Sequence, residues 1–117
     1  MPVTLDDIRS VALSLPRTEE ALVRDRVKFR VRRLVYLAFS RDESVMGFAF
    51  PKEERDGLVA SDPRKFELPS AGDLRYHWVH ARLSELDHEE MEELVVDAWG
   101  MVVPKFLFAE HEARRGR

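Results

Sequence analysis

Between Val23 and Arg33 the sequence alternates apolar and charged residues, and this alternation constrains the fold more than any other stretch. Successive side chains of an extended chain point to opposite faces, so the pattern predicts a strand with two unlike faces. The apolar face comprises Val23, Val27, Phe29 and Val31. The cationic face comprises Arg24, Arg26, Lys28, Arg30 and Arg32, with Arg33 at the following turn. Such a row is about 26 Å long, enough to follow several phosphates or the acidic face of a protein. An alternative places Arg24 and Arg26, which flank Asp25, in a bend between two strands and shortens the row to Lys28, Arg30 and Arg32.

An amphipathic helix over residues 5–14 is expected before this strand. Thr4 and Asp7 form a capping-box pattern, and apolar residues then recur at helical spacing until Pro16. After it, we expect a meander of strands at residues 21–23, 27–31, 34–40 and 45–50, with turns at 32–33 and 41–44. The last two strands are apolar on both faces, which is typical of central strands whose faces are covered or bind a partner.

The second half of the chain predicts a helix, a loop, a strand and a long helix. Pro51 begins a short helix that runs to about Ala60, and residues 61–74 form an irregular loop. The strand at 76–83 places Trp78, His80 and Arg82 on one face. The clearest helical stripe begins after Asp87 and ends at Pro104. The apolar residues 105–108 should dock on the domain, and residues 110–117 should fray.

These elements predict an α+β fold in which an antiparallel sheet of four to five strands carries the N-terminal helix and the long C-terminal helix on one face. With 117 residues, 44% of them apolar, the chain fits a single domain over residues 1–117. The absence of cysteine excludes disulfides, thiolate catalysis and cysteine-based zinc sites. Neither a signal peptide nor a membrane-spanning run is seen, so we expect a cytoplasmic protein.

Charge is distributed unevenly along the chain although the net charge is only −3. Six of the 19 cations lie between Arg24 and Arg33, whereas the segment 84–100 carries seven acids and no cation. This polarity suits an acidic ligand on one side, or pairing of the two sides within the fold or between subunits.

Several short motifs, taken in order, resemble those of the MmcQ/YjbR family. They are the segment 29–32 (Phe-Arg-Val-Arg), Pro51 with residues 53–55 (Glu-Glu-Arg), Asp62-Pro63 followed by Phe66, Trp78-Val79, and Ala98-Trp99 with residues 103–105 (Val-Pro-Lys). The resemblance covers about residues 5–105. It implies a double-wing fold, similar in shape to frataxin-like proteins, and a DNA-binding label that rests on structural analogy. Relatives usually place a glycine in the turn that Arg32-Arg33 occupies here, so the hairpin is expected to use a longer or different turn.

Two interpretations of the cationic row remain open: contact with phosphates, and a solvated strand face whose charges protect an edge and pair with nearby acids. Tyr36, Trp78, His80 and Arg82 could add aromatic and basic groups that stack unpaired bases, or Tyr36 and Trp78 could belong to the core. His77 and His80 point to opposite faces of a strand and cannot share a metal ion. We expect neither a metal site nor a cofactor.

The sequence therefore predicts a small non-enzymatic binding module, because it contains no nucleophile motif and no glycine-rich phosphate loop. The expected function is binding of nucleic acid, DNA above all, through Arg24, Arg26, Lys28, Arg30, Arg32, Arg33, Tyr36, Trp78 and Arg82. The alternative is a protein-interaction or self-associating module, in which the two-sided charge or the apolar central strands form the interface. No small-molecule substrate is indicated.

Overall fold

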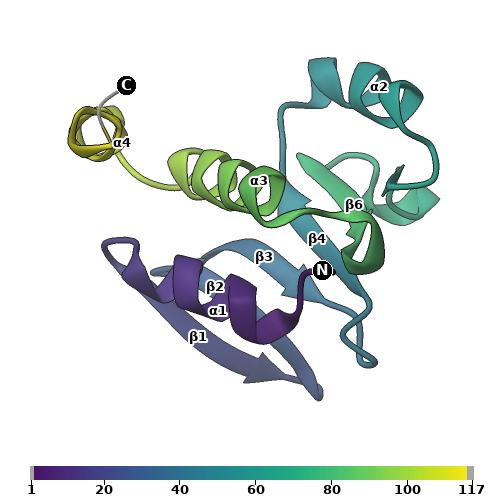
Figure 1. Cartoon of the computed structure of the whole chain (residues 1–117), viewed down its shortest axis with the longest axis horizontal. Coiled ribbons are helices and arrows are strands. Elements are labelled where there is room, and N and C mark those ends of the chain that lie inside the picture. The colour runs from purple at the N-terminus through teal and green to yellow at the C-terminus, as the bar shows by residue number, and fades with distance from the viewer. Residues whose placement is uncertain (1, 116–117) are drawn as a thin grey trace.

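The computed structural model describes residues 2–115, which form one sheet and several helices (Figure 1). The strands are β1 (Thr18–Val23), β2 (Arg26–Val31), β3 (Leu34–Phe39), β4 (Val45–Ala49), β5 (Phe66–Glu67) and β6 (Trp78–Arg82). The α-helices are α1 (Leu5–Ser14), α2 (Lys52–Ser61), α3 (His88–Gly100) and α4 (Lys105–Arg114). Two 3-10 turns, η1 (Ala71–Asp73) and η2 (Leu83–Glu85), flank β6.

The six strands form one antiparallel sheet in the order β1-β2-β3-β4-β6-β5. The first four are successive neighbours joined by short turns, so they form the predicted meander. After β4 the chain leaves the sheet through α2, adds β5 at the far edge, and returns as β6 between β4 and β5. The α+β class and the one-sided helix packing are therefore as predicted, with six strands in place of four or five.

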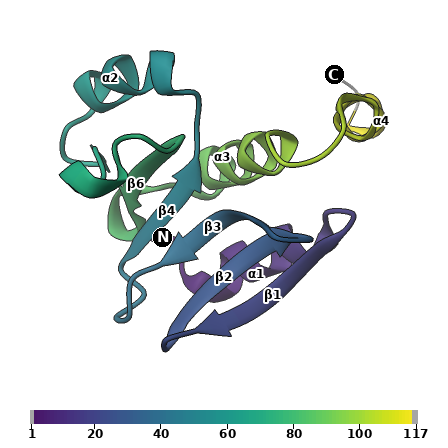
Figure 2. The same ribbon diagram turned by 180° about the vertical axis from the view of Figure 1, so that it is seen from behind.

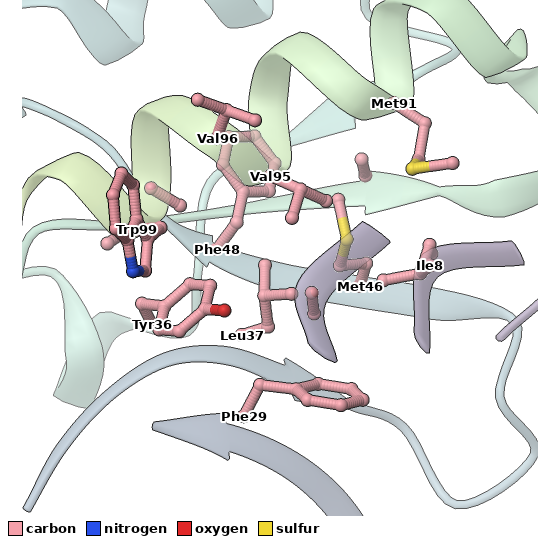
Figure 3. Close-up of a cluster of buried hydrophobic side chains, with 14 of the residues drawn as sticks. Ile8, Phe29, Tyr36, Leu37, Met46, Phe48, Met91, Val95, Val96 and Trp99 are labelled. Atoms are coloured by element: carbon pink, nitrogen blue, oxygen red, sulfur yellow. The ribbon is translucent and has the colours of Figure 1, made fainter. Parts of the chain in front are cut away.

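Helices α1 and α3 pack on the same face of the sheet and on each other (Figures 1 and 2). Between them and the strands lies the core, in which Ile8, Phe29, Met46, Val95 and Trp99 are fully buried (Figure 3). The Nε1 of Trp99 donates a hydrogen bond to the carbonyl oxygen of Pro16, at 2.9 Å, so the one polar atom of this large side chain is satisfied. In the view from behind, no helix covers strands β1 to β4 (Figure 2).

Both core helices begin where the sequence predicts. Thr4 accepts a hydrogen bond from the Asp7 amide while the Asp7 carboxylate accepts one from the Thr4 amide, which completes the capping box. These hydrogen bonds lower the pKa of Asp7. At α3, the Asp87 side chain accepts a hydrogen bond from the Glu90 amide at 2.7 Å.

Three predicted boundaries are wrong. Strand β1 begins at Thr18 rather than Ala21, because β1 pairs with β2 over its whole length. The predicted loop 61–74 contains the short strand β5, which pairs with β6. The expected frayed end is also wrong for residues 110–114, because they continue α4; residues 116 and 117 lie outside the described residues.

Helix α4 docks on the end of α3 through ring contacts of Phe108 and His111 with Trp99. The ring of Phe108 lies where a side chain on Gly100 would stand, and its centroid is 6.3 Å from that of Trp99. The prediction that residues 105–108 dock is confirmed for Phe108, while Phe106 remains 60% exposed. Across residues 2–115, no helix has the length and hydropathy that crossing a membrane requires.

Candidate functional site

The helix-free face of the sheet is hollowed into a groove of about 570 Å³. Its floor is the middle of the sheet, where Ala38 of β3 and Gly47 of β4 are direct cross-strand partners. Residues with little or no side chain at these two positions leave the centre of the face low, while longer side chains stand on either side. Arg26 and Lys28 line the groove from β2, and Trp78 and His80 line it from β6.

The cationic wall is formed by β2. Arg26, Lys28 and Arg30 alternate with core residues, as predicted, and Lys28 pairs across the sheet with Ala38 on the groove floor. The carboxylate of Glu19 on β1 lies 3.3 Å from Nε of Arg30, so this cation is partly neutralised. Within residues 2–115, neither Arg26 nor Lys28 forms an ion pair, and both face the groove. The available positive charge of the strand face is therefore concentrated on these two residues.

Three other predicted cations lie in the turns at the two ends of β2, so the cationic row is shorter than alternation over residues 23–33 predicts. The breaks fall between the strands predicted at 21–23, 27–31 and 34–40. Arg24 and Asp25 form the β1-β2 turn with φ angles of 53° and 65°. Val23 consequently belongs to β1 and pairs with Arg26, on the cationic side rather than the apolar one. Arg32 and Arg33 form the β2-β3 turn at the other end of β2. All three arginines are exposed, but none lines the groove.

Of the two alternatives for the β2-β3 turn, a longer one or a different one, the longer one is wrong, and the turn lies at residues 32–33 as predicted. It has two residues, because Val31 pairs directly with Leu34, and Arg32 adopts the left-handed conformation with φ 56°. A glycine would take this conformation without steric cost. The chain therefore keeps a tight turn with arginine at its left-handed position.

The aromatic wall stands opposite the cations. The indole of Trp78 covers Gly47, with its Nε1 2.8 Å from where a Cβ would stand, so a residue larger than glycine would displace the ring. Tyr76 also lines the groove; it is 52% exposed, and the guanidinium of Arg75 lies 4.9 Å from its ring centroid. Asp73 adds a carboxylate on this side.

Arg55 of α2 holds the aromatic wall in place. Its guanidinium donates hydrogen bonds to the carbonyl oxygens of Leu74 at 2.6 Å and Tyr76 at 2.9 Å, and a longer one to that of Trp78 at 3.4 Å. The planar fork of arginine suits several acceptors at once. One side chain thus fixes the backbone that carries both aromatic residues.

Tyr36 cannot contact a ligand on this surface, which corrects its predicted role. The register between β2 and β3 shifts by one residue, so that Phe29 pairs with Leu37 and Arg30 with Val35. The extra residue of this β-bulge is Tyr36, and both Tyr36 and Leu37 are consequently fully buried. Its hydroxyl is 2.7 Å from Oγ1 of Thr18, and burial raises the pKa of Tyr36 to about 12.

Arg82 shares the open side of β6 with Trp78 and His80, as predicted, but it does not line the groove. Its guanidinium donates to the carboxylate of Glu67 at 2.9 Å and to the carbonyl oxygen of Arg64 at 3.0 Å. His80 lies between Arg82 and Trp78. Burial lowers the pKa of His80, against the opposing effect of the Glu67 and Asp73 carboxylates, so that it is neutral near pH 7.

The acidic segment does not neutralise the cationic wall, because α3 lies on the other face of the sheet. Its acids have other partners: Glu90 pairs with Lys65 at 2.7 Å, and Glu92 lies 3.9 Å from Arg115. The pairing with Glu90 raises the pKa of Lys65. Among residues 2–115, no group of three or more acidic or histidine side chains is arranged to hold a metal ion.

Sequence reasoning missed three residues that shape the groove: Gly47, Arg55 and Tyr76. Period-two alternation does place His80 beside Trp78, and it places Gly47 opposite the core residues Met46 and Phe48. No local pattern indicates that Arg55 and Tyr76, 21 positions apart, meet through a hydrogen bond.

Comparison with known proteins identifies the fold and the family. The crystal structure of Deinococcus radiodurans protein DR2400, which carries the DUF419 domain, matches with a TM-score of 0.73 and 21% sequence identity, over 85% of this chain and 78% of that chain. At this identity the likeness shows a shared fold. The comparison with curated protein sequences found no match. The YjbR family model matches residues 13–101, and the chain therefore belongs to the YjbR family.

Proposed function

We propose that the open face of the sheet binds nucleic acid through its phosphates, with Arg26 and Lys28 as the central contacts. The observation that carries the proposal is that both cations face a groove without an ion pair among the described residues. Lysine and arginine side chains neutralise phosphates and release counterions, which gives binding that depends on salt rather than on sequence. Arg24, Arg32 and Arg33 stand at the two ends of β2 and extend the positive surface along the strand.

The role proposed is binding and not catalysis. His80 is the imidazole of the groove, and within residues 2–115 it makes no hydrogen bond to a serine or threonine hydroxyl that it could activate. With two to four phosphate contacts, log K should fall with log salt concentration at a slope of about −2 to −4 on duplex DNA. Binding of this kind is weak at physiological salt and becomes measurable at low ionic strength.

Titrations of a labelled duplex and a labelled single strand at several salt concentrations test the proposal. The Lys28→Ala variant should weaken binding and reduce the steepness of the salt slope by about one unit on duplex DNA. Lys52→Ala is the matched control, because Lys52 is an exposed cation at the start of α2 and does not line the groove. Absence of salt-dependent binding even at low ionic strength would sink the proposal.

The ion pair between Glu19 and Arg30 allows a test in which binding should become stronger rather than weaker. Glu19→Gln keeps the shape of the side chain but removes the charge 3.3 Å from Arg30. The freed guanidinium should strengthen binding and steepen the salt slope by up to about one unit. Stability should change by only about 0–1 kcal/mol, because the pair is exposed to solvent. Unchanged or weaker binding would show that Arg30 is not near the bound phosphates.

Self-association is a second candidate, favoured by the exposed edge of β1. This strand is at the end of the sheet order, and Leu22 and Val23 on it are 70% and 39% exposed. An unpaired strand edge can pair with a second chain. Light scattering at low and high salt tests this: dimers that dissociate when Leu22 is replaced by lysine would support it, and a monomer under both conditions would reject it.

A further inference from the structure

We infer that the groove takes an unpaired base, so that the preferred partner is a single-stranded nucleic acid with its base against Trp78 and Tyr76 and its phosphates on Arg26 and Lys28. This inference rests on the proposed function and specifies its partner. It follows from the shape of the groove, from the separation of cations and aromatic rings across it, and from the position of Asp73.

The shape of the groove favours a flat ligand that enters the sheet face. Across the sheet, Lys28, Ala38, Gly47 and His80 are successive cross-strand partners. The two middle positions form the floor, with the short side chain of Ala38 at one and the Trp78 ring over Gly47 at the other. Three interstrand spacings, about 14 Å, separate the backbones that carry the two walls. At about 570 Å³, the groove is within the range of sites that hold small organic groups.

The aromatic wall distinguishes an unpaired base from a paired one. Within a duplex, each base is stacked between its neighbours, so its flat surface is not accessible to a side chain. Protein aromatic rings stack instead on bases that have been splayed out of a helix or that belong to a single strand. Tyr76 is half exposed beside the groove, and the larger ring of Trp78 lies at its floor over Gly47.

Charge sets the direction in which a nucleotide would lie. Asp73 lines the aromatic side, where its carboxylate disfavours a phosphate, while Arg26 and Lys28 attract one on the β2 side. The imidazole of His80 lies next to the floor and, being neutral near pH 7, can both donate and accept hydrogen bonds with the edge of a base. The base therefore belongs with β6 and the backbone with β2.

Four probes separate these contributions: a labelled DNA single strand of about ten nucleotides, a duplex of the same length, a sugar–phosphate strand without bases, and a free mononucleotide as competitor. The single strand should bind more tightly than the duplex and the abasic strand, and the mononucleotide should compete only weakly. Tryptophan emission should be quenched by the single strand, and this quenching should disappear in Trp78→Phe, because Trp99 is fully buried.

The Tyr76→Ala variant should weaken single-strand binding by about 5- to 150-fold and leave the abasic strand unaffected. Phe106→Ala is the matched control, since Phe106 is a similarly exposed ring on α4, outside the groove. Arg55→Lys should act in the same direction as Tyr76→Ala, because it loosens the backbone of residues 74–78 without removing a ring or a charge.

Each contrary outcome has a distinct meaning. Equal binding of single strand, duplex and abasic strand, weakened in all cases by Lys28→Ala, would overturn base recognition and leave the proposed phosphate binding intact. A mononucleotide that competes as well as the strand would overturn the strand assignment in favour of a free nucleotide. No binding of any probe at low salt would overturn both the inference and the proposed function.

Discussion

The two faces of the sheet are made by the same strands, but one is packed as a core under helices and the other is open to solvent. On the helix-covered face, Phe29, Met46, Phe48 and Val79 are fully buried in the core under α1 and α3. On the open face, their immediate neighbours in sequence are Lys28, Gly47 and His80, which surround an unfilled groove. A core is determined by close packing, because unfilled space there costs stability. A face without a covering layer can keep a hollow, and in this protein the hollow is lined by the charges and rings that a ligand would contact.

Phe29 and Lys28 provide the sharpest test of this difference, because they are adjacent on β2 and point to opposite faces. Phe29→Ala should lower the free energy of unfolding by about 3–5 kcal/mol, since it leaves a cavity in the core. Lys28→Ala should change it by no more than about 0.5 kcal/mol while weakening nucleic-acid binding. Denaturant unfolding measures the first effect. Similar destabilisation by both variants would break the contrast between the faces.

Gly47 tests whether the groove floor needs the absence of a side chain. In Gly47→Ala the new Cβ would meet the Trp78 ring, whose Nε1 stands 2.8 Å away, so the ring must move. We expect a loss of about 1–3 kcal/mol in unfolding free energy and a change in the accessibility of Trp78 to a fluorescence quencher. Gly57→Ala is the control, because nothing lies within 4 Å of its Cβ position. Equal effects at the two glycines would show that Trp78 does not depend on Gly47.

Tyr36→Phe tests the bulge that turns a tyrosine from the open face into the core. The substitution removes the hydroxyl that is hydrogen-bonded to Thr18 and should cost about 0.5–1.5 kcal/mol of unfolding free energy. Nucleic-acid binding should not change, since Tyr36 is fully buried. Thr18→Val and the double variant complete a cycle that isolates the hydrogen bond. Reduced binding by Tyr36→Phe without loss of stability would contradict the placement of this residue.

His80 should give the smallest effect, visible as a dependence of stability on pH. Burial lowers its pKa in the folded state below the unfolded value of about 6.5, so the unfolded chain binds the proton more readily. The free energy of unfolding is therefore not reduced by His80 above about pH 6.5, and it decreases as the pH falls below this value towards the lower pKa of the folded state. Thermal unfolding at successive pH values should show a smaller decrease for His80→Gln. Identical pH profiles for the two proteins would mean that His80 is not desolvated in the groove.

Local sequence patterns predict most of the elements because their causes are local. The capping box at Thr4, the apolar stripe of α3 and the alternation of β2 and β6 each specify an element through neighbouring residues. The frayed end predicted for residues 110–117 is wrong over 110–114, because the cause of helix formation there is not local. Residues 110–114 are polar except for Ala113, and their helix docks on α3 through Phe108, which lies against Gly100 and Trp99, and through His111, whose ring lies beside Trp99. No local pattern reveals these contacts.

The candidate site was predicted in part. Alternation correctly identifies Arg26, Lys28 and Trp78 as residues of a non-core face, and the structure brings all three to one groove. The same alternation fails at Tyr36, because one extra residue in β3 reverses which face each side chain occupies. The alternation also ends at Arg24, where the backbone turns between the strands predicted at 21–23 and 27–31.

The sequence by itself determined which strand is cationic, because the direction of side chains in an extended chain depends only on their spacing. Only the tertiary structure decided which of those cations are available, since Glu19 reaches Arg30 through the pairing of β1 with β2, whereas α3 carries its acids to the opposite side. It also decided that the cations face aromatic rings across a floor of Ala38 and Gly47. Such relations depend on strand order and register, which bring together residues that are distant along the chain.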